Sequence, residues 1–269
     1  MGVPLNNKPL LHFAHANGFP SGAYKALLRR LEPDHRVIAI DQVGHDKRYP
    51  VSDNWGRLAD QLADFLRARA DEPVVGVGHS LGALLTFLAA VRHPALFRAV
   101  VMLDPPVLFG ASALVMRAAK RLGKVDALTP AGLSRGRRRH WPDREQVKAQ
   151  LGRKRLFRAF DPECLDDYVR FGTAAAENGV ELVFRPEVEV EIFRTIPHDL
   201  HRYSRLQVPG ALVYGEGSDV ALRGEVRRFA RRFGLQLSAM PGGHMFPLER
   251  PAATATHLRQ LIVRLLGEA

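Results

Sequence analysis

The sequence predicts an α/β protein: a mainly parallel sheet with helices on both faces, and a mostly helical segment inserted between the fourth and fifth predicted strands. Two observations predict this. Short apolar segments alternate with amphipathic ones up to residue 105 and again from residue 210, as in sheets covered by helices on both faces. Between residues 106 and 209 the alternation stops and most of the chain has helical patterning. We therefore expect a first core part (1–105), a helical cap (106–209) and a second core part (210–269).

Each predicted strand is a short apolar run bounded by polar residues, glycine or proline. The six runs are residues 9–15, 36–41, 73–78, 98–104, 210–216 and 235–240. The predicted helices instead carry apolar side chains three and four positions apart, as at Leu58, Leu62 and Leu66. They span residues 24–31, 55–69, 81–91, 222–233 and 254–266.

Composition indicates an ordinary globular chain. The 269 residues are 46% hydrophobic and 25% charged, and no stretch of about 18 uncharged apolar residues predicts a membrane-spanning helix. The N-terminal residues lack the basic start and apolar run of a secretory signal. Cys164 is the single cysteine, which fits a reducing compartment. We expect a cytoplasmic location.

The net charge of +11 is unevenly distributed, and the most basic stretch lies in the first half of the predicted cap. Between residues 117 and 158 there are fourteen lysines and arginines against three acidic residues. Such a block can attract an anionic partner, or it can be a solvated helical face. We hypothesise that an acidic carrier protein or an anionic surface binds through Arg135, Arg137, Arg138 and Arg139, and we expect no nucleic-acid partner.

Ser80 lies in the segment Gly78-His79-Ser80-Leu81-Gly82, between an apolar strand and an apolar helix. A tight strand-to-helix turn lifts a serine above the sheet and aims the helix N-terminus at the reacting atoms. A serine hydroxyl becomes a useful nucleophile when a base takes its proton and nearby donors stabilise the oxyanion. The small residues on either side allow the backbone to make this turn. Ser80 is therefore the candidate nucleophile.

Three motifs resemble the α/β-hydrolase superfamily: this turn, the segment HANGFP from residue 15 to 20, and GGHMFP from residue 242 to 247. The resemblance implies a serine hydrolase with a helical cap and His244 as general base. It also implies an oxyanion hole made by the backbone amides of Asn17 and Leu81. Ala16 stands where the family commonly has glycine.

The triad in this fold runs in the order serine, acid, histidine. Asp219 follows the fifth strand, where the family usually keeps its acid, and we expect it to orient His244. The segment from residue 215 to 219 has one residue more than the common pattern. Asp104, at the end of the fourth strand, therefore remains the alternative acid, and Glu216 a further one.

The leading functional hypothesis is hydrolysis of a carboxylic ester, as in carboxylesterases and lipases, through an acyl-enzyme on Ser80. A thioesterase, an esterase for a carrier-bound acyl group, a carbon–carbon bond hydrolase and a perhydrolase would use the same machinery. A binding protein on an inactive hydrolase scaffold is the alternative from another class. No metal-ligand or dinucleotide motif occurs in the sequence, so we expect neither a metal nor another cofactor.

Overall fold

The core of the protein is a six-stranded sheet in which all strands run parallel. A computed structural model describes residues 8–267 of the chain. The strand order is β2-β1-β3-β4-β8-β9, and each neighbouring pair is parallel. The strands are β1 (Leu10–Ala14), β2 (Arg36–Ala39), β3 (Val74–His79), β4 (Phe97–Leu103), β8 (Gly210–Gly215) and β9 (Gln236–Met240).

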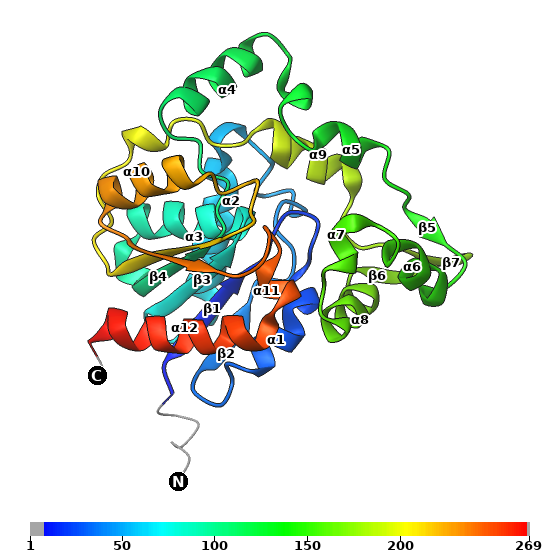
Figure 1. The fold of residues 1–269 in the computed structure, drawn as a ribbon, viewed down its shortest axis with the longest axis horizontal. Helices are drawn as coiled ribbons and strands as arrows, with labels where there is room; N and C mark the ends of the chain where they lie inside the picture. The colour runs from blue at the N-terminus through cyan, green and yellow to red at the C-terminus, as the bar shows by residue number, and fades with distance from the viewer. Residues whose placement is uncertain (1–7, 268–269) are drawn as a thin grey trace.

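Helices cover both faces of this sheet, as the alternation of apolar segments predicted (Figure 1). On one face α2 (Gly56–Arg69), α3 (Leu81–Arg92) and α10 (Arg223–Phe233) bury side chains in a shared apolar core. On the other face α1 (Lys25–Arg29) and α12 (Pro251–Leu266) contribute to a second core. The short α11 (Phe246–Glu249) follows β9. The carboxyl ends of the parallel strands meet at one edge, where ligands bind in open α/β sheets.

The cap enters between β4 and β8 and extends to one side of the sheet (Figure 1). Its helices are α4 (Ala111–Arg121), α5 (Ala131–Arg135), α6 (Arg144–Leu151), α7 (Arg155–Arg158), α8 (Pro162–Phe171) and α9 (Pro186–Arg194). Short 3-10 turns lie at Ser21–Tyr24, Asp53–Trp55, Pro94–Leu96, Val125–Ala127 and Leu200–Arg202.

The cap also contains a small antiparallel sheet that the sequence pattern did not indicate. Its order is β5-β7-β6, formed by β5 (His140–Trp141), β6 (Thr173–Ala176) and β7 (Gly179–Leu182). Glu177 and Asn178 form the turn of a hairpin between β6 and β7, and Gly179, the first residue of β7, takes a φ of 114°. The alanines of β6 favour a helix when taken alone. Pairing with β7 overrides that preference.

Among residues 8–267, no helix is both long enough and apolar enough to cross a membrane.

Candidate active site

The turn between β3 and α3 holds Ser80 in a strained conformation above the sheet. Its φ of 54° and ψ of −114° lie outside the common regions for a residue with a side chain. A Cβ on Gly78 would lie 2.2 Å from the carbonyl oxygen of Gly82, and one on Gly82 would lie 2.1 Å from that of Ala14. Only glycine fits at either position, so the two glycines allow the backbone to turn this sharply.

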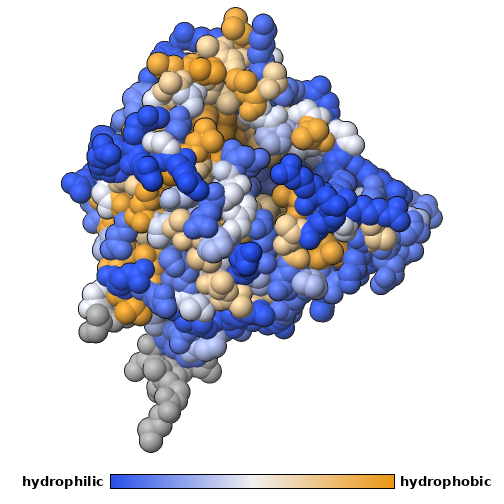
Figure 2. Space-filling view, viewed as in Figure 1, coloured by the Kyte–Doolittle hydropathy of each residue, from blue (hydrophilic) through white to orange (hydrophobic). Residues whose placement is uncertain are grey.

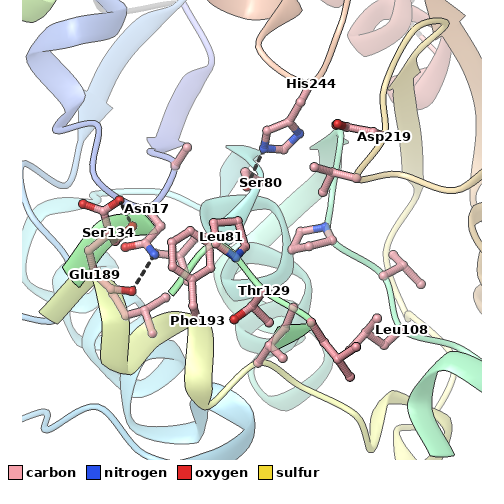
Figure 3. A pocket seen from close by; sticks show the side chains of 18 of the residues that line it. Asn17, Ser80, Leu81, Leu108, Thr129, Ser134, Glu189, Phe193, Asp219 and His244 are labelled. Carbon is pink, nitrogen blue, oxygen red and sulfur yellow. Dashed lines mark hydrogen bonds between the residues drawn. The ribbon is translucent and has the colours of Figure 1, made fainter. Parts of the chain in front are cut away.

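Ser80, His244 and Asp104 form a chain of hydrogen bonds. The Ser80 hydroxyl donates to His244 Nε2 at 3.0 Å (Figure 3), and His244 Nδ1 donates to Asp104 Oδ2 at 2.7 Å. Because a carboxylate can only accept, the Asp104 contact fixes the proton of a neutral imidazole on Nδ1. Nε2 is then free to accept the serine proton, which is the arrangement that general-base catalysis requires.

Asp104 follows β4 directly and is fully buried. Besides the imidazole, its carboxylate accepts from the amide of Gly215 at 2.6 Å and from the hydroxyl of Ser218 at 2.5 Å. Its backbone lies in the left-handed region, with a φ of 44°. The end of β8 and the loop after it therefore supply hydrogen-bond donors to the Asp104 carboxylate.

The structure thus differs from the first expectation for the acid. Asp219 is exposed and lines the pocket near His244 (Figure 3), while Asp104, the alternative, holds the hydrogen bond to Nδ1. Glu216 is also exposed. The physical reason is the longer loop after β8: Ser218 turns inward to Asp104, and the next residue is left at the surface.

A buried histidine, His79, supports the backbone of His244. His79 Nε2 contacts the carbonyl oxygen of His244 at 2.9 Å, and its Nδ1 contacts the Tyr24 hydroxyl at 2.7 Å. A carbonyl only accepts, so Nε2 carries the proton and Tyr24 donates to Nδ1. The amide of Ala16 donates to the same hydroxyl at 3.3 Å. Burial lowers the pKa of His79, which favours this neutral form.

Asn17 and Leu81, whose backbone amides are expected to form the oxyanion hole, line the same pocket as Ser80. Leu81 begins α3, whose first amides have no partner within the helix, and Asn17 lies in the loop after β1. In the part of the chain that the structure describes, neither amide has a hydrogen-bond partner. The Asn17 side chain is fixed, because its Nδ2 donates to the carbonyl oxygen of Glu189 at 3.0 Å. Its buried Oδ1 has no partner among the described residues and can accept from a ligand.

A cavity of about 580 Å³ opens beside Ser80, between the core and the cap. Its size is typical of small-molecule sites, and most of its lining is apolar. From the core come Ala16, Asn17, Phe19, Trp55, Ser80, Leu81, Asp219, Val220, Leu222, His244 and Met245. From the cap come Pro106, Val107, Leu108, Met116, Leu128, Thr129, Pro130, Ser134, Leu156, Glu189, Ile192, Phe193 and Ile196.

A buried ion pair connects the cap to the loop that carries Asn17. Arg137 donates to Glu189 Oε2 at 2.8 Å, and the Ser134 hydroxyl donates to Glu189 Oε1 at 2.7 Å. Arg137 also contacts the hydroxyl of Tyr168. A Cβ on Gly18, whose φ is 80°, would lie 3.1 Å from the Glu189 carboxylate. Glycine at this position lets the ion pair pack directly on the loop. Sequence reasoning missed this network, because its residues are far apart in the chain.

The arginine cluster is not the free cationic rim that the charge pattern suggested. Arg137 is mostly buried in the network above. Arg135 pairs with Asp126 and Arg139 with Glu187. Arg138 lies over the Trp141 ring and donates to the carbonyl oxygen of His140. Acidic residues of the cap therefore pair with three of these four arginines, and an acidic carrier protein gains no support from the cluster.

Residues 8–267 contain no group of three or more histidine, cysteine, aspartate or glutamate side chains arranged to hold a metal ion. Cys164 is buried, and burial raises the pKa of its thiol to about 12, so it is not a reactive nucleophile.

A family model described as the alpha/beta hydrolase family matches residues 13–257, nearly the whole chain. The chain belongs to the α/β-hydrolase family. The match includes the Ser80 turn, the cap, and the turn that carries His244.

Curated relatives differ in what they act on. A 2-(acetamidomethylene)succinate hydrolase of Mesorhizobium japonicum is 35% identical over 102 residues, 36% of this chain and 35% of the relative. The rat (Rattus norvegicus) monoglyceride lipase is 34% identical over 129 residues, 44% of this chain and 43% of the relative. A type I acyl-CoA thioesterase of Penicillium roqueforti is 29% identical over 176 residues, 59% of this chain and 38% of the relative. The chain thus aligns with less than half the length of each.

Solved structures extend the likeness of fold to nearly the whole chain. The crystal structure of E-2-(acetamidomethylene)succinate hydrolase has a TM-score of 0.76 and 22% identity, and the match covers 95% of this chain and 92% of the other. A thioesterase domain from the curacin biosynthetic pathway has a TM-score of 0.70 and 20% identity, with 94% and 91% covered.

Proposed function

We propose that this hydrolase cleaves a carboxylic ester with an apolar acyl chain, through an acyl-enzyme on Ser80. The observation that carries the proposal is the hydrogen-bonded chain from Ser80 through His244 to the buried Asp104, at one end of a mostly apolar pocket. That chain is the apparatus of serine nucleophiles. Intact apparatus of this kind argues against an inactive binding protein.

In the proposed mechanism, Ser80 attacks the ester carbonyl while His244 takes its proton at Nε2. Asp104 holds the imidazole in the required tautomer and stabilises its charge after the transfer. The negative charge on the tetrahedral oxygen is stabilised by the amides of Asn17 and Leu81, which have no other partner among the described residues. His244 returns the proton to the leaving alcohol. It then activates a water molecule that releases the acid and frees Ser80.

The pocket supports an apolar acyl group. Met116, Ile192 and Ile196, among others, would surround a chain extending from Ser80 into the cap, and burying it removes apolar surface from water. Glu189 is held by Arg137 and Ser134 and so does not present an unpaired charge to that chain. A relative that is named a monoglyceride lipase fits this reading, and one named an acyl-CoA thioesterase makes a thioester the competing substrate. A cytoplasmic location stays a prediction from the sequence.

The test is a panel of p-nitrophenyl esters and acyl thioesters with two to sixteen acyl carbons, assayed with purified protein and with the Ser80→Ala variant. We expect kcat/KM for esters to exceed that for thioesters of the same acyl chain, and Ser80→Ala to remove turnover of both. A fluorophosphonate probe should label the wild type on Ser80 alone.

Higher kcat/KM for thioesters would reassign the bond cleaved while leaving the nucleophile in place. No turnover on the whole panel combined with no labelling would contradict the proposal. Labelling without turnover would leave Ser80 as an active nucleophile and would contradict the simple ester as substrate.

A further inference from the structure

Helix α4 presents an apolar face to solvent as well as one to the protein. On the side of α4 that packs against the protein, Ala113, Met116 and Ala119 are buried. On the outer side, the exposed fractions are 67% for Leu114 and 56% for Val115, and Leu122, which follows the helix, is 69% exposed. Figure 2 shows apolar side chains gathered at the top of the molecule, where Figure 1 places α4. Grouped large apolar side chains at a surface mark an interaction site more often than scattered ones do.

The charged residues around this face are cationic. Residues 105–125 contain four lysines and arginines and no acidic residue. Lys120 is tied to Asp53 of the core, whereas Arg117, Arg121 and Lys124 are exposed. Arg117 and Arg121 lie on α4 among the apolar positions, and Lys124 follows the helix. Cations bordering an apolar face in this way are typical of helices that lie in a membrane interface.

Helix α10 extends the cationic surface beside α4. It carries five arginines and one acidic residue, and that residue, Glu225, is 7% exposed. Its carboxylate instead accepts from the Phe109 amide and the Ser112 hydroxyl, which join α10 to the start of α4. Exposed acidic residues near this surface include Glu216 and Asp219, which precede α10, and Asp53, which is paired with Lys120. The combined α4 and α10 surface is therefore strongly positive.

The pocket opens toward the same surface. Leu128 and Leu222 line the pocket and are 53% and 51% exposed, so they lie at its mouth. Leu128 follows α4 in the cap, and Leu222 immediately precedes α10. Met116, on the inner side of α4, lines the interior. Apolar side chains thus line the pocket from Leu128 and Leu222 at its exposed edge inward to Ser80.

We propose that α4, together with α10, docks this protein on the surface of a membrane containing anionic phospholipids. Leu114, Val115 and Leu122 enter the boundary between headgroups and acyl chains, and the surrounding lysines and arginines contact the lipid phosphates. Such a surface offers negative charge directly above apolar chains, which matches both features of this face. A substrate with an acyl chain could then enter between Leu128 and Leu222 without crossing water. Only this entry route rests on the proposed function.

The test is flotation with phosphatidylcholine vesicles, with and without 30% phosphatidylglycerol, using the Ser80→Ala protein so that catalysis cannot alter the lipid. We expect binding to the anionic vesicles to be at least about tenfold tighter than to the neutral ones and to weaken in 0.5 M salt. The triple variant Leu114→Ser/Val115→Ser/Leu122→Ser should lose about tenfold or more of that affinity. Replacing Arg117, Arg121 and Lys124 with glutamine should remove the preference for anionic lipid.

Val263→Ser is the matched control, because Val263 is 41% exposed on α12, on the other face of the sheet. It should bind vesicles as the parent does. Two controls establish that the variants fold. One is circular dichroism, and the other is hydrolysis of a soluble short-chain ester by proteins that carry the same substitutions but retain Ser80. Equal binding to both vesicle types, or no effect of the triple variant, would overturn the proposal. So would a dimer in solution that the triple variant abolishes, since the face would then bind a second copy.

Discussion

At the scale of single residues, Asp104 combines an unfavourable backbone conformation with a fully satisfied carboxylate. A left-handed φ in a residue with a side chain costs about 1–3 kcal/mol, and Asp104 adopts it directly after β4. In return, the carboxylate receives hydrogen bonds from His244, Gly215 and Ser218. The position is therefore built around a carboxylate at this site, which favours Asp104 over Asp219 as the group that orients His244.

The first prediction compares the two acids. Asp104→Asn should lower kcat by roughly 10³–10⁴, because an amide can hold the imidazole in the wrong tautomer. Asp219→Asn, at an exposed position, should change kcat less than about threefold, since it is Asp104 that accepts the hydrogen bond from His244 Nδ1. Steady-state kinetics on the preferred ester measure both. A larger loss in the Asp219 variant would return the acid to the loop after β8.

His12 is fully buried, yet its ring makes no hydrogen bond within the described residues. Both ring nitrogens are buried without a partner among the described residues, and the ring lies 5.4 Å from that of Phe65. Burial lowers the pKa of His12 from 6.5 to about 3, and that of His15 to about 4. The unfolded chain binds these protons near pH 6.5 and the folded one does not. These two histidines therefore leave the free energy of unfolding unaffected above about pH 6.5. They lower it progressively as the pH falls below about 6.5, because the unfolded chain then binds more protons.

The second prediction follows from this sign. His12→Leu removes one such group, so the free energy of unfolding should fall less between pH 7 and pH 5 in the variant than in the wild type. A difference on the order of 1–2 kcal/mol is expected at pH 5. Urea denaturation at the two pH values measures this difference. Both proteins contain the same carboxylates, so the effect of carboxylate titration cancels in the comparison. Equal losses in both proteins would show that His12 titrates normally in the folded state.

At the scale of elements, the contact between α9 and the loop after β1 couples the cap to the catalytic centre. The carbonyl oxygen of Glu189 fixes the Asn17 side chain, while Arg137 and Ser134 hold the Glu189 carboxylate. Glu189 thus joins three segments: α5, α9 and the loop that carries an expected oxyanion amide. A change in the ion pair should reach catalysis through the position of Asn17.

The third prediction breaks this pair. Arg137→Met leaves a buried carboxylate unpaired and should cost about 3–5 kcal/mol of stability. The double variant Arg137→Met/Glu189→Leu should recover most of that loss, since two apolar side chains can replace a buried ion pair. Arg138→Met is the matched control: Arg138 is exposed, and its loss should cost less than about 1 kcal/mol. Urea midpoints distinguish the variants, and a double variant no better than the single one would contradict the argument.

The sequence determined elements better than it determined contacts between them. The strands of the core were predictable because each is a continuous apolar run ending at polar residues or glycine. The Ser80 turn was predictable because its backbone geometry demands glycine on either side. The acid was not, since a carboxylate after β4 and one after β8 can both approach His244. The ion pair between Arg137 and Glu189 spans 52 positions, and no local pattern reports such a contact.

At the scale of the whole molecule, the pocket lies between the core and the cap, and both contribute to its lining. The core supplies Ser80 and His244, and the cap supplies most of the apolar wall. The chemistry and the selectivity for acyl length should therefore be separable. Substitutions in the cap that alter the volume of the pocket should change which ester is preferred while leaving the reacting groups in place.

The last prediction tests that separation at α4. Met116 is buried and lines the pocket, so Met116→Trp should reduce the space available to an acyl chain. We expect kcat/KM for long-chain p-nitrophenyl esters to fall by about tenfold or more, because a chain that no longer fits loses its apolar contacts. For the two-carbon ester the change should stay within about threefold, since that substrate needs only the space beside Ser80. Leu114→Trp is the control, because Leu114 lies on the outer face of the same helix and does not line the pocket. Leu114→Trp introduces the same side chain two positions away on the exposed side of α4. It should leave the chain-length profile unchanged when monomeric, soluble esters are used. A uniform loss across all chain lengths in the Met116 variant would mean that α4 supports the catalytic groups rather than the acyl chain.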